Sequence, residues 1–241
     1  MSTSRTDVSQ ARSGRPLRQR GGPRAATFEE LFLPLDRQLE NVRRWNRERS
    51  WGFTELDFLD VELTPTEKDG PLVVDIVCPL LDDAASLGGV QRTFEELWQV
   101  TAEQYPSSWW WGDSHPHRKG VRLLDGITHT PGIRRVTVEL DAYWNPVISV
   151  RPLDVRGPRA ANAEVLAASA HFPKWVQAMD GKRFPYVWLS GYQVTHPDYE
   201  AWRRLPCLSW NQRHRRINLT DHWADNYEYG WASPLRRAST P

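Results

Sequence analysis

Cysteine is nearly absent from this sequence, and its scarcity excludes several architectures. The chain of 241 residues holds two cysteines, Cys78 and Cys207. Two thiols cannot build a disulfide framework or a four-thiolate zinc site. We therefore predict two buried, reduced thiols in a cytoplasmic protein, with a single Cys78–Cys207 bridge as the alternative.

Long apolar runs are missing as well. No stretch approaches the ~18 residues that a membrane-spanning helix needs, and the first residues lack the apolar segment of a secretory signal peptide. The sequence therefore predicts neither a membrane partner nor export. It also lacks the glycine-rich phosphate-binding loops, the HExxH zinc pattern and the G-x-S-x-G nucleophile turn. No motif therefore identifies a reaction.

Basic charge is distributed unevenly. Only four of the 31 basic residues are lysines, a ratio that codon usage in a GC-rich genome explains as readily as a need for guanidinium groups. Residues 1–26 contain six arginines and one acid, so they carry +5, and residues 27–241 carry −4 of the total of +1. Because residues 1–26 have almost no large apolar side chains, we predict a disordered, arginine-rich arm there, followed by a single globular domain over 27–241.

Three segments have the spacing of helices. Thr27-Phe-Glu-Glu30 is a capping box that precedes apolar residues at helical spacing, with Pro34 placed to split the helix. The same letters recur at 93–96, which predicts a second capped helix beginning at Thr93. Residues 160–179 form an alanine-rich segment that opens at Asn162 and is interrupted near Pro173. A short fourth helix is predicted at 197–204.

Strand patterns separate these helices. Residues 53–63 alternate apolar side chains, with a shift between Phe58 and Leu59, and residues 72–78 are almost wholly apolar, as expected of a central strand. Residues 134–144 and 147–150 read as a hairpin, and four more short strands follow between 184 and 235. With three to four helices and seven to nine strands, the sequence predicts an α+β domain with a largely antiparallel sheet.

The three consecutive tryptophans at 109–111 allow two interpretations. In a strand, Trp109 and Trp111 would share one face and Trp110 the other. The chain has 13 tryptophans, and burying one indole removes on the order of 200 Å² from water, so a buried wall is the favoured interpretation. The alternative is a ligand-stacking surface made by Trp109, Trp111 and Trp210.

Polar residues follow the tryptophans directly. Asp113, His115 and His117 occupy alternate positions and could together hold a divalent metal such as zinc or manganese. A bound metal would support a metal-dependent hydrolase or nuclease. The segment is short, further ligands are not identifiable, and Pro116 suits a turn, so a solvated loop is favoured and no cofactor is predicted.

A second basic segment lies between two short predicted strands at 211–216. It places Arg213, Arg215 and Arg216 after Trp210, and a basic hairpin tip beside aromatic rings is typical of nucleic-acid surfaces. A solvated turn is the alternative. The arm would add the further phosphate-binding residues Arg15, Arg18, Arg20 and Arg24.

These observations favour binding over catalysis, because the binding surfaces need no unidentified ligands. We expect a non-catalytic binding protein whose partner is nucleic acid. The alternatives are the metal-dependent hydrolase that uses Asp113, His115 and His117, and a protein–protein assembly component, since Trp and Arg are common at interface hot spots. The sequence does not determine the oligomeric state.

Overall fold

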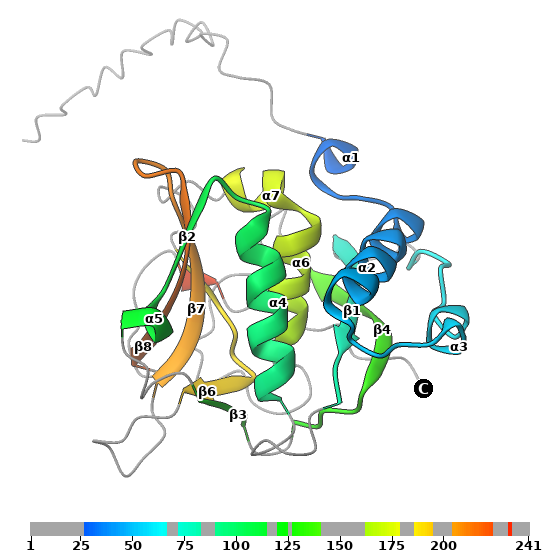
Figure 1. Cartoon of the computed structure of the whole chain (residues 1–241). Coiled ribbons are helices and arrows are strands. Elements are labelled where there is room, and N and C mark those ends of the chain that lie inside the picture. The colour runs from blue at the N-terminus through cyan, green and yellow to red at the C-terminus, as the bar shows by residue number, and fades with distance from the viewer. Residues whose placement is uncertain are drawn as a thin grey trace, which may run out of the picture.

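The computed structural model describes residues 27–66, 72–82, 90–114, 120–124, 127–140, 162–178, 186–194, 204–223 and 231–232. It confirms the predicted fold class, α+β with an antiparallel-rich sheet. In Figure 1 two helices, α4 (Gln91–Glu103) and α6 (Ala163–His171), stand between a larger sheet and a two-stranded one. The predicted arm, residues 1–26, lies outside the described residues.

The first helix forms as its capping box predicts. The Thr27 amide donates to the Glu30 carboxylate (2.8 Å) and the Glu30 amide donates to the Thr27 hydroxyl (3.3 Å) at the start of α1, Phe28–Leu31. Pro34 then separates α1 from α2, Leu35–Arg49. A second predicted interruption is also confirmed, because α6 ends at His171 and α7, Pro173–Ala178, begins at the proline.

The second predicted capping box is wrong. Helix α4 begins two residues earlier, at Gln91, so Thr93 lies inside the helix and is buried. Its hydroxyl accepts from the Leu81 amide (2.8 Å) rather than from a helix amide. The residues of a capping box are present, but the Thr93 hydroxyl is hydrogen-bonded to Leu81, which is distant in sequence, and so does not cap the helix.

The strand predicted at 53–63 is also wrong. Residues Glu55–Leu59 form the short helix α3, because the Asp57 carboxylate accepts from both the amide (2.7 Å) and the hydroxyl (2.8 Å) of Thr54. Phe58 is buried, whereas Leu56 and Leu59 are exposed. The irregular apolar pattern of residues 53–63 is thus explained by a short helix with one buried side, not by a strand.

Two sheets are present in the described residues. Strand β1 (Val73–Leu80) pairs antiparallel with β4 (Gly132–Glu139). The larger sheet has the order β2-β8-β7-β5-β9, with β6 joining β3 to β7. Its strands are β2 (Ser107–Trp110), β3 (Val121–Leu123), β5 (Tyr186–Trp188), β6 (Tyr192–Val194), β7 (Arg204–Asn211), β8 (Arg216–Trp223) and β9 (Trp231–Ala232). Among the strand pairs that the structure describes, β2·β8 and β5·β9 are parallel and the others are antiparallel.

Two of the predicted elements lie wholly or mostly outside the described residues. The hairpin partner at 147–150 lies outside them, and the described partner of β4 is β1. Most of the helix predicted at 197–204 lies outside them too, but its last residue, Arg204, begins β7 instead.

Side chains close part of the edge of β1 that faces away from β4, at Asp75 and Val77. The amide of Gln38, on α2, donates to the Asp75 carbonyl (3.0 Å) and accepts from the Val77 amide (2.9 Å). His171, on α6, approaches the Val77 carbonyl with Nε2 at 2.9 Å. Unpaired backbone groups are costly to bury. These two side chains make the hydrogen bonds that a neighbouring strand would otherwise make.

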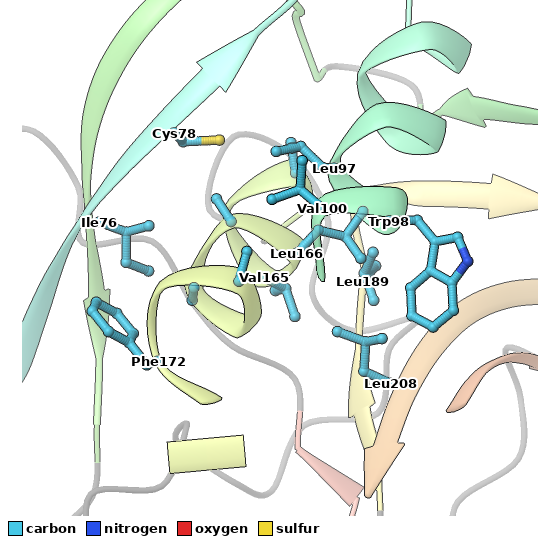
Figure 2. Packing of buried hydrophobic residues seen from close by; sticks show 14 of the residues in the cluster. Ile76, Cys78, Leu97, Trp98, Val100, Val165, Leu166, Phe172, Leu189 and Leu208 are labelled. Carbon is cyan, nitrogen blue, oxygen red and sulfur yellow. The ribbon is translucent and has the colours of Figure 1, made fainter. Parts of the chain in front are cut away.

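The core fills the space between the sheets. Figure 2 shows Val165 and Leu166 of α6 lying between Ile76 and Cys78 of β1 on one side and, on the other, Leu208 of β7 and Leu189, which directly follows β5. Cys78 and Cys207 are buried and free, as predicted, and burial raises the pKa of the Cys207 thiol well above its usual value. None of the described helices combines the length and the apolar composition that crossing a bilayer requires.

Replacing Gln38 by leucine tests the closure of the β1 edge. The substitution preserves apolar packing but leaves the Asp75 carbonyl and the Val77 amide without their partner. Each orphaned group costs about 1–3 kcal/mol, so the free energy of unfolding should fall by roughly 2–6 kcal/mol in urea titrations. Arg37→Ala is the matched control, since its side chain is exposed on the same helix turn. Equal stability of the two variants would contradict this account.

His171 should make the protein acid-sensitive. Burial lowers the pKa of His171 from 6.5 to about 4, with a smaller contribution from the charge of Arg44. The unfolded chain therefore takes up a proton near pH 6.5, while the folded protein resists it until pH falls to about 4. The free energy of unfolding should be highest above pH 6.5 and fall by about 3 kcal/mol between these values. This decline should flatten in His171→Gln and persist in His214→Gln, whose side chain is exposed.

Candidate functional site

The tryptophan run forms part of the core wall. Strand β2 ends at Trp110, and the short helix α5, Trp111–Ser114, begins at the next residue. Trp110 is 8% exposed and Trp111 is 1% exposed. Trp111 packs edge-on against Phe94 of α4, with ring centroids 6.2 Å apart. A Cβ added to Gly112 would lie 2.5 Å from the Trp110 ring, so the chain passes this ring with no space to spare.

The change from strand to helix corrects the predicted alternation. Trp109 and Trp111 do not share a strand face, because Trp111 belongs to α5. Trp210 is buried as well, with its ring 5.6 Å from that of Tyr105. Of the three proposed stacking residues, Trp109 alone is half-buried rather than buried.

Trp109 lies beside an arginine on the outer side of the sheet. Strands β2 and β8 run parallel, with Trp109 opposite Asn218 and Ser107 opposite Arg216. This register places the Arg216 guanidinium 6.0 Å from the centre of the Trp109 ring. A cation at this distance from an indole is attracted by the ring's π electrons, so the two side chains form one amphipathic surface.

The hairpin between β7 and β8 extends this surface. Its loop, residues 212–215, is exposed, and Figure 1 shows it beside the turn that leads from α4 into β2. The His214 amide donates to the Asn211 side chain (3.0 Å), and Arg215 adopts a positive φ of 48° that closes the turn. Arg213 and Arg215 are thus presented at the end of a two-stranded antiparallel ribbon.

Polar side chains complete the patch below the loop. Arg216 donates through Nε to the side-chain Oδ1 of Asn218 (2.8 Å), and the Asn218 side-chain Nδ2 donates to the Ser209 hydroxyl on β7 (3.4 Å). Residues 209–218 contain three arginines and no acid. We refer to this surface as the tip patch, formed by Trp109, Ser209, Arg213, Arg215, Arg216 and Asn218.

Ser209 and Asn218 were not predicted from the sequence. Each is a common polar residue in a strand, and only the pairing of Ser209 with Asn218 brings them to the same place as Trp109. The signal that was available is their position: both flank the basic segment, and Asn218 lies two residues after Arg216.

The remaining predicted residues are not brought together by the described structure. Asp113 is exposed on α5, while His115 and His117 lie outside the described residues. Within the described ranges no three His, Cys, Asp or Glu side chains converge as a metal site would require. Arg15, Arg18, Arg20 and Arg24 also lie outside these ranges.

Comparison with other proteins adds no functional assignment: no family model, no curated protein and no solved structure matches this chain. The site is therefore interpreted from its own geometry.

Truncating two neighbouring tryptophans tests the distinction between wall and surface. Trp111→Ala removes a buried indole and should lower the free energy of unfolding by about 3–5 kcal/mol. Trp109→Ala removes a half-buried ring and should cost about half as much, as measured by urea titration. A Trp109 variant as unstable as the Trp111 variant would show that both rings serve the core.

Proposed function

We propose that this chain is a non-catalytic binding protein for single-stranded nucleic acid, and that the tip patch is its main contact surface. The observation that carries the proposal is the Arg216 guanidinium lying over the half-buried Trp109 ring, beside the exposed Arg213 and Arg215. Cationic groups and an indole at one surface match the two chemical parts of a nucleotide.

The residues divide the work of recognition between them. Guanidinium groups bind phosphate oxygens, and displacement of counterions from the phosphates supplies much of the affinity. The Trp109 indole offers a surface on which a base can stack, while Ser209 and Asn218 offer hydrogen-bonding groups. Stacking on one indole requires an unpaired base, which favours single strands over a duplex.

The predicted arm adds a second basic element. Its +5 charge contrasts with the −4 charge of residues 27–241, so the arm and the tip patch are the regions that attract a polyanion. Arg15, Arg18, Arg20 and Arg24 would contact phosphates beyond the nucleotides on the tip patch. Such contacts position the strand without reading its sequence.

Binding is tested by fluorescence anisotropy with labelled single-stranded oligonucleotides over a range of salt concentrations. Each phosphate contact contributes a slope of about −0.7 in log affinity against log salt. The double variant Arg213→Gln/Arg215→Gly should therefore weaken binding and reduce the slope by about 1.4 in magnitude. Glycine at 215 accepts the positive φ, so the turn is preserved.

The matched control removes two exposed arginines elsewhere, Arg37→Gln/Arg44→Gln on α2. This variant should retain the affinity and slope of the wild type. Trp109→Leu should lose about 1–3 kcal/mol of binding free energy at every salt concentration, because stacking is not a charge effect. Absence of binding at low salt, or an equal loss in the control, would refute the proposal.

A further inference from the structure

A groove of about 620 Å³ lies between α1, the start of α2, residues 63–66 and the start of β1. Its walls are mostly apolar, with Phe28 and Phe32 among them. Leu33 and Leu63 also line it and are 40% and 41% exposed. Exposed apolar surface that is gathered into a groove is typical of a binding site.

The charge of this groove has one sign. Glu29, Asp36 and Asp75 line it, and none of its lining residues is basic. Thr66 and Thr137 hold the Asp75 carboxylate through hydroxyl contacts of 2.7 Å and 2.6 Å. Among the described residues, no cation forms an ion pair with Glu29 or Asp36, although both are exposed. The groove therefore favours a ligand that is both cationic and partly apolar.

An unpaired strand edge runs along the groove. The Leu140 amide donates to the Leu72 carbonyl, so the alternate residues Val73, Asp75 and Val77 direct their backbone groups away from β4. Gln38 and His171 satisfy the Asp75 carbonyl and both groups of Val77. No described residue bonds the Val73 amide and carbonyl on this side, or the Asp75 amide. An extended peptide pairing here would add a strand to the sheet.

The arm has the composition that this groove favours. It carries +5, and its residues Pro16 and Leu17 lie between Arg15 and Arg18. It is joined through Thr27 to Phe28, which lines the groove, so its effective concentration there is high. Gly21-Gly22-Pro23 supplies a turn signal that would let the preceding residues run back along β1.

We propose that residues 15–20 of the arm dock in this groove as an extended strand beside Val73–Asp75. The Leu17 side chain fills the apolar space, and Arg15 and Arg18 approach Glu29 and Asp36. When the Leu17 backbone faces β1, the Pro16 nitrogen faces away, so its missing N–H costs no hydrogen bond. This docking does not depend on the proposed nucleic-acid binding; it describes what the arm does without a polyanion.

Hydrogen exchange of the full-length chain, followed residue by residue by NMR without nucleic acid, tests the docking. The Asp75 amide and the arm amides that face β1 in this register, those of Leu17 and Gln19, should be protected in the wild type. Leu17→Asp should accelerate exchange of the Asp75 amide at least tenfold. Val8→Asp is the matched control, since it places the same charge at another apolar residue of the arm, outside residues 15–20, and it should leave this exchange unchanged.

A second variant removes two of the acidic charges of the groove instead of changing the arm. Glu29→Gln/Asp36→Asn keeps the size of two exposed side chains and should also accelerate exchange at Asp75, while the thermal unfolding temperature stays within a few degrees. Equal Asp75 exchange in the wild type and Leu17→Asp would overturn the proposal. Protection that disappears on dilution would overturn it in favour of a second copy as the occupant. Because no nucleic acid is present, neither result bears on the tip patch.

Discussion

Burial of α6 is the constraint on which the rest of the fold depends. Every residue from Ala163 to His171 is buried, although the helix is only nine residues long. Its alanines allow close approach, since a small side chain lets neighbouring elements come near the helix axis. One side faces β1 and the other faces α4 and the larger sheet. A helix that is buried on every side is stable only where other elements cover it, so α6 is held by the elements on both of its sides.

Hydrogen bonds from neighbouring elements fix the position of α6 and carry its influence to the tip patch. Thr101, on α4, donates through its hydroxyl to the Leu166 carbonyl (2.9 Å), and Tyr105 donates to the Ser169 carbonyl (2.8 Å). Tyr105 lies two residues before β2 and packs on Trp210 of β7. The helix therefore sets where β2 and the β7–β8 hairpin lie, and hence where Trp109 meets Arg216.

Local sequence signals predicted those parts of the fold that local chemistry determines. The Thr27 capping box, the interruptions at Pro34 and Pro173, and the fold class follow from caps, prolines and periodicity. The sequence misled where a distant partner decided the outcome: Thr93 bonds Leu81 instead of capping a helix, and Trp111 leaves the strand to pack on Phe94. Of the tip patch, the arginines and Trp109 could be named from the sequence. Ser209 and Asn218 could not, because their relation depends on strand register.

The proposed groove and tip patch compete for one cationic segment. If the arm occupies the groove when no polyanion is present, its arginines contribute to nucleic-acid binding only after they leave Glu29 and Asp36. The observed affinity is then lower than the intrinsic one by the fraction of molecules whose arm is free. Salt weakens both contacts, because both join opposite charges at an exposed surface. The arm therefore contributes less to the slope of log affinity against log salt than its five net charges imply. Arg213 and Arg215 contribute their full amount to this slope.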